Sequence, residues 1–262
     1  MLNRLRRIIA PVAPRPKGAS GSRAYAVGDI HGRLDLLDQL LAMIEADVKE
    51  RSKRRTFVVF LGDLIDRGDS SAGVIDRLRA WKAADVRPVF IAGNHEEVML
   101  RVLAREEGVL SDWLKFGGAE CLESYGLDVA ELKKLGESAA LDRINAAVPR
   151  THKDFLAEMG DSFRFGDYLF VHAGIRPGVP IAEQHIKDLR WIREPFLSDA
   201  KEHGFVVVHG HTISKTVEDR GNRIGIDTGA YASGELTALL VEDEARCYLS
   251  TASCTADTAV TR

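Results

Sequence analysis

The chain has little of what would mark a membrane, secreted or nucleic-acid-binding protein. No apolar run approaches the roughly 20 residues that a helix needs to cross a bilayer, so we expect no membrane span. Only three cysteines occur, Cys121, Cys247 and Cys254, and they lack Cys-x-x-Cys spacing, which favours a reducing, cytoplasmic setting. The formal net charge of −3 gives no overall attraction to nucleic acid, so we expect no nucleic-acid partner.

The two ends of the chain differ from the part between them. Residues 1–22 are basic and interrupted by prolines, which predicts a disordered tail rather than a secretory signal. A weak membrane-surface or transit role is the alternative for this segment. Residues 251–262 are also predicted to be unstructured. The remaining 23–250 have the composition of a globular protein and are expected to form one domain.

Three similar units follow one another in the first part of the chain. Short apolar runs at 24–27, 57–61 and 88–92 predict buried strands, and helical periodicity follows at 34–44 and 71–83. Each apolar run ends at a glycine that precedes an aspartate or an asparagine. Because strand–helix–strand units form right-handed crossovers, the three loops should lie at the same edge of one parallel sheet.

The rest of the chain predicts a helical insertion and a β-rich C-terminal half. Residues 96–160 are mostly helical in pattern and would form a cap beside that sheet edge. Trp113, Phe116 and Tyr125 could line a substrate groove in this cap, although packing between helices is the commoner use of such residues. Further strands are expected at 163–165, 168–171, 205–208, 223–227, 236–241 and 246–249. Parallel strands early and antiparallel strands late predict an α/β (α+β) fold with two packed mixed β-sheets flanked by helices.

Side chains that can bind metal follow five of the predicted strands. They are Asp29, His31, Asp63, Asn94, His172 and His211. A single histidine is more often structural than a ligand, but this joint pattern is improbable by chance. Carboxylate, imidazole and amide donors without a thiolate suit Mn²⁺, Fe²⁺ or Zn²⁺ rather than a closed structural zinc site. Two ions roughly 3.5–4 Å apart that share Asp63 could activate water and hold a phosphoryl group for in-line displacement.

Five motifs carry a resemblance to a known family. They are Gly28-Asp29-Ile30-His31-Gly32, Gly62-Asp63-Leu64-Ile65-Asp66-Arg67-Gly68, Gly93-Asn94-His95-Glu96, Val171-His172-Ala173-Gly174 and Gly210-His211-Thr212. In this order they resemble the signatures of the calcineurin-like metallophosphoesterases over roughly residues 23–241. The second and third motifs resemble the phosphoprotein phosphatase branch, which includes bacterial and phage serine/threonine phosphatases and symmetrical diadenosine tetraphosphate hydrolases.

The resemblance implies a role for each site residue. Asp29, His31 and Asp63 would hold one divalent ion, and Asp63, Asn94, His172 and His211 the other; Mn²⁺ is expected, with Fe or Zn as alternatives. His95 would be the general acid, held and tuned by Asp66. Substrate would contact Arg67, Asn94 and Arg193, the last being preferred to Arg190. Tyr231 either contacts substrate or packs, and His209 is expected to be structural.

Three functions remain open at this point. The leading one is hydrolysis of phosphoserine or phosphothreonine in proteins by direct attack of a hydroxide that bridges the two metals. The first alternative is the symmetrical hydrolysis of bis(5'-nucleosyl) tetraphosphates, with the same metals and nucleophile. The second is a scaffold that binds metal or phosphate without catalysis, although a binding module needs no proton donor such as His95. The expected partner is a phosphorylated protein or a small phosphorylated substrate.

Overall fold

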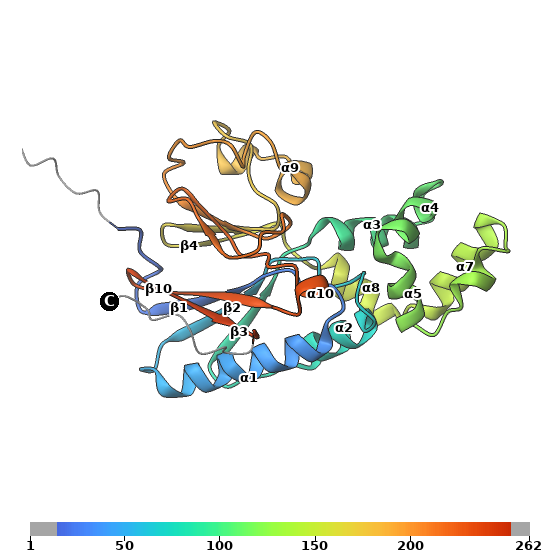
Figure 1. Cartoon of the computed structure of the whole chain (residues 1–262), viewed down its shortest axis with the longest axis horizontal. Helices are drawn as coiled ribbons and strands as arrows, with labels where there is room; N and C mark the ends of the chain where they lie inside the picture. Colours follow the sequence, from blue (N-terminus) through green and yellow to red (C-terminus); the bar gives the residue numbers. More distant parts are fainter. Residues whose placement is uncertain (1–14, 253–262) are drawn as a thin grey trace, which may run out of the picture.

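The computed structural model describes residues 15–252 and arranges them in layers around two five-stranded sheets (Figure 1). The first sheet has the order β10 (Ala245–Ser250), β9 (Thr237–Glu242), β1 (Ser22–Val27), β2 (Arg55–Phe60) and β3 (Val86–Phe90). The second has the order β4 (Ser162–Phe165), β5 (Tyr168–Val171), β6 (Val206–His209), β8 (Arg223–Gly225) and β7 (Glu218–Asp219). The predicted fold class, two packed mixed sheets flanked by helices, is confirmed.

Helices cover the outer faces of both sheets. Helices α1 (Leu34–Glu50) and α2 (Ser71–Ala80) lie along the first sheet, whereas α9 (Ile186–Trp191) lies over the second (Figure 1). The short helices η2 (Ile181–Glu183) and α10 (Ala230–Ser233) are in connecting segments. The predicted insertion is helical and projects from one end of the sheets. It contains α3 (Asn94–Leu103), α4 (Val109–Trp113), the kinked turn η1 (Leu114–Gly118), α5 (Ala119–Ser124), α6 (Val129–Leu132), α7 (Glu137–Ala147) and α8 (Arg150–Ala157).

Strand periodicity explains the layers. Side chains alternate between the two faces of a strand, so neighbouring residues of β1 belong to different cores. Tyr25 packs in the cluster that contains the buried side of α1, whereas Ala24 packs in the cluster between the two sheets. A third cluster joins the second sheet to α9 through Leu169 and Leu189. The first cluster also includes buried side chains of the cap, so the insertion is packed onto the same core.

Parallel pairing brings the functional loops to one edge. Strand β1 pairs in parallel with β2, and β2 with β3, as the repeated units predict. The expectation that the late strands are antiparallel is only partly correct, because β5, β6 and β8 also pair in parallel. Strands β9 and β10 instead join the first sheet, where β9 pairs antiparallel with β1. A buried apolar run does not specify which sheet it will join, since either interior satisfies it equally.

The ends of the described chain pack more closely than expected. The Lys17 N–H donates to Asp167 at 2.8 Å, and the Gly18 N–H donates to the Asp243 carbonyl at 2.7 Å. Packed structure therefore begins before residue 23, and Thr251 is likewise buried. The remaining parts of the predicted tails, residues 1–14 and 253–262, lie outside the described residues. Between residues 15 and 252, no helix is both long and apolar enough to cross a membrane.

Candidate active site

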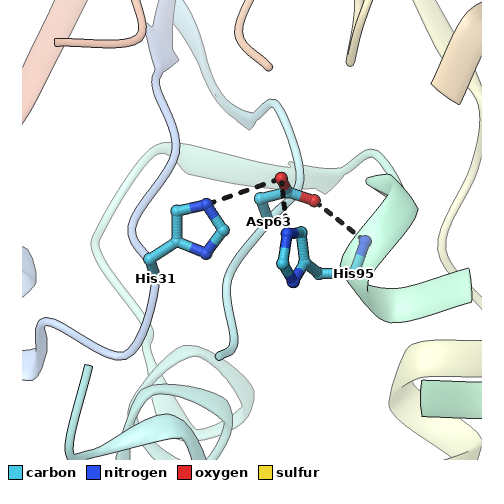
Figure 2. A group of neighbouring side chains, drawn as sticks. All are labelled: His31, Asp63 and His95. Carbon is cyan, nitrogen blue, oxygen red and sulfur yellow. Dashed lines mark hydrogen bonds and ion pairs between the residues drawn. The ribbon is translucent and has the colours of Figure 1, made fainter. Parts of the chain in front are cut away.

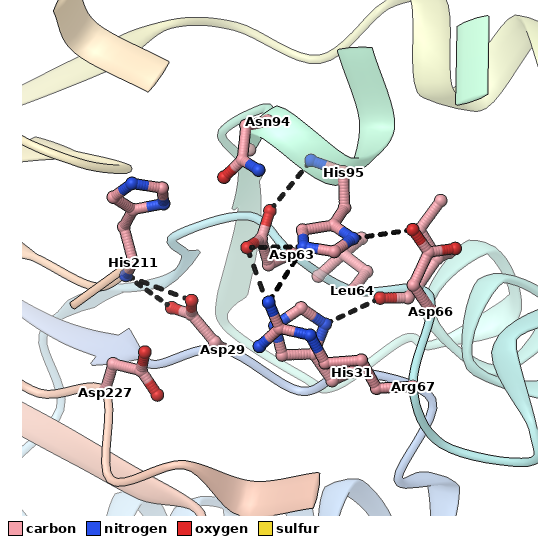
Figure 3. A network of polar contacts seen from close by, with 12 residues as sticks. Asp29, His31, Asp63, Leu64, Asp66, Arg67, Asn94, His95, His211 and Asp227 are labelled. Carbon is pink, nitrogen blue, oxygen red and sulfur yellow. Dashed lines mark hydrogen bonds and ion pairs between the residues drawn. The ribbon is translucent and has the colours of Figure 1, made fainter. Parts of the chain in front are cut away.

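The loops that follow β1, β2, β3 and β6 meet around the buried carboxylate of Asp63 (Figures 2 and 3), and the loop after β5 brings His172 to the same carboxylate. One carboxylate oxygen of Asp63 lies 3.6 Å from His31 Nε2, and the other lies 3.4 Å from His172 Nε2. Potential donor atoms form two groups in which all atoms lie within 4.8 Å of one another: His31, Asp63 and His95, and Asp63, His172 and His211. Asp63 is the member common to both groups, which is the geometry expected of a shared ligand.

Backbone carbonyls orient two of the histidines toward Asp63. His31 Nδ1 lies 2.8 Å from the Ile65 carbonyl, and His172 Nδ1 lies 2.8 Å from the Leu61 carbonyl. Because a carbonyl only accepts, each Nδ1 carries the proton and each Nε2 presents its lone pair to the site. Burial lowers the pKa of His31 to about 3 and lowers that of His172 as well, which favours the neutral form that a metal ligand requires.

The contacts around His172 would suit a bound cation. Its unprotonated Nε2 lies 3.0 Å from the Asn94 side-chain oxygen and 3.2 Å from His211 Nδ1. The Asn94 oxygen and His172 Nε2 are both acceptors, and a cation near both would offset their repulsion, whereas His211 Nδ1 can donate to His172 Nε2 when it carries the ring proton. The other ring nitrogen of His211, Nε2, is buried and has no hydrogen-bond partner among residues 15–252. This donor set fits a divalent ion of the Mn²⁺, Fe²⁺ or Zn²⁺ type.

Asp29 lies at the site but outside the two groups of donor atoms. Its carboxylate oxygens accept the His211 backbone N–H at 3.2 and 3.0 Å (Figure 3). Burial, reinforced by the neighbouring carboxylates Asp227 and Asp63, raises the pKa of Asp29 well above its usual value. The carboxylates of Asp29, Asp63 and Asp227 repel one another in their charged forms, and a bound cation would offset this repulsion. The assignment of Asp29 as a ligand remains a prediction.

His95 differs from the other histidines at the site. Its Nδ1 lies 2.6 Å from Asp66, and its Nε2 lies 3.9 Å from Asp63 and 3.2 Å from the Arg67 guanidinium. Burial lowers the pKa of His95, but Asp63 and Asp66 outweigh it and hold the pKa above its usual value. A buried imidazole whose pKa is held up by two carboxylates suits a general acid better than a metal ligand. The predicted role of His95 rests on this difference, although its position within one donor group would allow ligation.

A cavity of about 680 Å³ opens from Asp63 toward the cap. Its lining includes Arg67, Asn94, His95, Trp113, Phe116, Trp191, Arg193 and His211. Arg193 is exposed, and its guanidinium reaches the His211 carbonyl at 3.4 Å. Arg190 instead binds Asp161 at 2.6 Å and Glu97 at 3.3 Å. This difference favours Arg193 as the second phosphate-binding arginine.

The aromatic candidates separate into three roles. Trp113 and Phe116 both line the cavity, and Phe116 is 66% exposed. Tyr125 does not line it, because its hydroxyl contacts His152 within the cap at 3.0 Å. The Tyr231 ring lies 4.7 Å from the Arg67 guanidinium carbon, so it supports that arginine from the side. His209 is buried against Phe196 and belongs to neither donor group, in agreement with a structural role.

Comparison with known proteins assigns the family. Residues 22–243 match the family described as calcineurin-like phosphoesterase. The chain belongs to the calcineurin-like phosphoesterase family. The members of this family are phosphoester hydrolases that use divalent metal ions, and the chain is one of these hydrolases with two His/Asp groups that could bind such ions.

Relatives of this calcineurin-like phosphoesterase include two kinds of enzyme. It is 28% identical over 234 residues to the asymmetrical bis(5'-nucleosyl)-tetraphosphatase PrpE of Anoxybacillus flavithermus, covering 81% of this chain and 88% of the relative. It is also 28% identical over 227 residues to serine/threonine-protein phosphatase 1 of Salmonella typhimurium, covering 83% and 91%. A crystal structure provisionally described as a diadenosine tetraphosphatase shares the fold, with a TM-score of 0.63, 18% identity and coverage of 90% and 98%.

Two site residues of this phosphoesterase were not assigned from the sequence. Glu96 is fully buried, and its carboxylate accepts the backbone N–H groups of Gly93, Asp63 and Leu64. Asp227 lies beside Asp29 (Figure 3), and burial raises its pKa to about 6. Both belong to segments that the sequence had marked, Gly93–Glu96 and 227–231. Their contacts join loops distant in sequence, so a local pattern could not reveal them.

Proposed function

We propose that this phosphoesterase hydrolyses phosphomonoesters, with phosphoserine or phosphothreonine in proteins as the substrate. The observation that supports this proposal is the position of Asp63 between two groups of donor atoms, with His95 at its side. Two divalent ions would activate water as the nucleophile and offset charge on the phosphate. The residues proposed to hold them are Asp29, His31, Asp63, Asn94, His172 and His211. We propose that the ions are Mn²⁺ and that the protein is cytoplasmic.

The side chains around the donor groups would carry the remaining steps. Arg67 and Arg193 both line the cavity and would hold the phosphate oxygens through their planar guanidinium groups. His95 would donate its Nε2 proton to the leaving oxygen of the alcohol. Asp66, bound to Nδ1 of the same ring, would hold His95 in place and stabilise its protonated form.

Hydrolysis of bis(5'-nucleosyl) tetraphosphates is the second candidate. The chain is 28% identical both to PrpE, which is named a bis(5'-nucleosyl)-tetraphosphatase, and to serine/threonine-protein phosphatase 1. The same metals, arginines and proton donor would serve a phosphoanhydride. A scaffold without catalysis is disfavoured, because the chain belongs to a family of phosphoester hydrolases and pairs His95 with Asp66 at 2.6 Å, an arrangement that binding alone does not require.

A side-by-side substrate comparison tests these candidates. Protein loaded with Mn²⁺ is offered a phosphoserine peptide, an aryl phosphate and diadenosine tetraphosphate, and kcat/KM is measured for each. The highest value for the phosphopeptide supports the proposal, whereas the highest value for the tetraphosphate replaces it with the second candidate. In that case the products, two ADP or ATP with AMP, distinguish symmetrical from asymmetrical cleavage. No turnover with Mn²⁺, Fe²⁺ or Zn²⁺ would contradict both.

A further inference from the structure

One turn of the cap makes hydrogen bonds to two adjacent residues of the active site. The turn consists of residues 113–118, which end α4 and form η1, and we call it the cap turn. The Trp113 indole N–H donates to Asp66 Oδ2 at 2.8 Å. The Gly117 carbonyl accepts the backbone N–H of Arg67 at 3.0 Å. The cap turn therefore contacts both the partner of the proposed general acid and the proposed phosphate-binding arginine.

Asp66 and Arg67 need such contacts because of their backbone conformation. Their φ angles are 72° and 67°, in the left-handed region that residues with a side chain rarely occupy. Conformations of this kind persist where the surroundings hold them. Ser71 accepts the Asp66 N–H at 2.9 Å, so one contact comes from the same loop. The contacts from the cap turn come instead from a segment about 50 residues away in sequence.

The Asp66 carboxylate is held through a single oxygen. Oδ2 binds both His95 Nδ1, at 2.6 Å, and the Trp113 indole. Oδ1 is buried and has no hydrogen-bond partner among the described residues 15–252. Without the indole N–H, the Asp66 carboxylate could rotate about its Cβ–Cγ bond. The His95 ring would then either turn with the carboxylate or lose its hydrogen bond to Oδ2. Trp113 thus limits the orientation of Asp66 and, through it, the orientation of His95.

Two glycines allow the cap turn to approach this closely. A Cβ on Gly117, which has a φ of 108°, would lie 2.6 Å from both N and Cγ of Arg67. A Cβ on Gly118 would lie 2.5 Å from the Trp113 ring. Distances below 3 Å are not tolerated, so a larger residue at either position would displace the arginine or the indole. The glycine pair is therefore explained by the contact with the active site.

We propose that the cap turn is a positioning element for catalysis. Trp113 acts on the general acid His95 through Asp66, and Gly117 fixes the backbone from which Arg67 reaches the phosphate. This inference rests on the proposed function, because it assumes that His95 donates a proton. It assigns the cap a part in the chemistry in addition to lining the cavity.

The test compares Trp113→Phe with Trp81→Phe. The Trp81 indole also donates to a carboxylate, that of Glu45 at 2.8 Å, but lies outside the site, so its variant is the matched control. Trp113→Phe should lower kcat for a phosphoserine peptide about 10- to 100-fold, the range expected for a slightly misplaced catalytic group. The loss should be smaller for p-nitrophenyl phosphate, whose leaving group needs little protonation. Trp81→Phe should leave both rates near those of the unchanged protein.

A double-mutant cycle separates positioning from a general structural effect. In a His95→Asn background, Trp113→Phe should cause no further loss, because the group through which it acts is gone. Equal losses in both backgrounds, or for both substrates, would overturn the proposal. If the unchanged protein hydrolyses none of the substrates with any metal, the proposed function fails instead. The two failures are therefore distinguishable.

A second variant tests the proposal if Trp113→Phe does not fold. Gly117→Ala should raise KM at least about tenfold by displacing Arg67, as expected when a charge-assisted contact with phosphate is lost. Its control is Gly126→Ala, at a cap glycine that also has a positive φ (79°) but no atom within 4 Å of the added Cβ. Similar KM values for the two alanine variants would contradict the role of Gly117.

Discussion

The buried carboxylate of Glu96 accepts the backbone N–H of Asp63 at 2.8 Å. The same carboxylate accepts the N–H groups of Leu64 at 2.7 Å and Gly93 at 2.8 Å, so it joins the loops after β2 and β3. Asp63 has a φ of 48°, which its side chain disfavours, and these contacts hold it there. The central residue of the site is thus positioned by a carboxylate that does not face the cavity.

Replacing Glu96 with glutamine should loosen this junction. A glutamine at this position has one acceptor oxygen, and its NH₂ group would face a backbone N–H that Glu96 accepts. At least one of the three buried N–H groups would then have no acceptor. We expect a loss of about 3 kcal/mol in the free energy of unfolding, measured by urea denaturation. Glu97→Gln is the control, since Glu97 is half-buried and its carboxylate pairs with Arg190 at 3.3 Å rather than with backbone N–H groups of the site. Equal stability of the two variants would contradict the role of Glu96.

His95→Asn distinguishes a proton donor from a metal ligand. As a general acid, His95 should contribute about 10²–10⁴-fold to kcat, while the metal content stays unchanged. Turnover and elemental analysis of the same preparation measure both quantities. Loss of bound metal would instead make His95 a ligand, as its place in one donor group allows. His185→Asn is the control, because asparagine can replace its cap at the start of α9.

Asp63→Asn should affect both ions, because Asp63 belongs to both donor groups. The amide keeps the shape but loses the charge and one of the two oxygen ligands. We expect metal content and turnover to fall together. Asp128→Asn serves as the control, since asparagine is an equally good N-cap for α6. Full metal occupancy in Asp63→Asn would exclude the bridging position.

The two candidate arginines should respond differently to truncation. Arg193→Ala removes an exposed guanidinium that lines the cavity, and kcat/KM should fall about tenfold or more while stability is unchanged. Arg190→Ala leaves Asp161 and Glu97 without their partner and should lower the free energy of unfolding by about 1–3 kcal/mol. The reverse pattern would assign phosphate binding to Arg190.

Asp47 should make stability depend on acid pH. Burial raises the pKa of Asp47, but hydrogen bonds from Arg51 and Tyr25 outweigh it and leave the pKa below the usual 3.8. A lowered folded-state pKa stabilises the fold above pH 3.8, and this contribution is lost as pH falls through the folded-state value. Asp47→Asn should therefore cost about 1 kcal/mol at neutral pH, with the difference shrinking below pH 3.8.

The matched control for this effect is Asp38→Asn, also on α1. Asp38 is exposed and pairs with Arg77 at 2.6 Å, so its replacement should change the free energy of unfolding by less than about 0.5 kcal/mol. The free energy of unfolding of the unchanged protein and the two variants is measured by thermal or urea denaturation. The measurements span about pH 2.5–7, so that they include the usual aspartate pKa of 3.8. A pH-independent cost of Asp47→Asn would contradict the linkage.

The sequence by itself determined the units that build the fold and the residues that meet at its edge. Apolar runs of strand length, each ended by a glycine and a polar residue, predicted β1, β2 and β3 and their parallel pairing. It also marked Asp63 and the histidines as candidate ligands, because each of them directly follows a recognisable buried-strand pattern. These features depend on short-range periodicity, which is complete within a few residues.

Only the tertiary structure decided what depends on contacts between distant segments. It placed β9 and β10 in the first sheet, gave Glu96 its three backbone partners and set Trp113 against Asp66. It also distinguished Arg193 from Arg190, because Arg193 contacts the His211 carbonyl whereas Arg190 pairs with Asp161. The physical reason is that hydrogen bonds and ion pairs form with whatever neighbour the fold supplies, and no local pattern of residues specifies that neighbour.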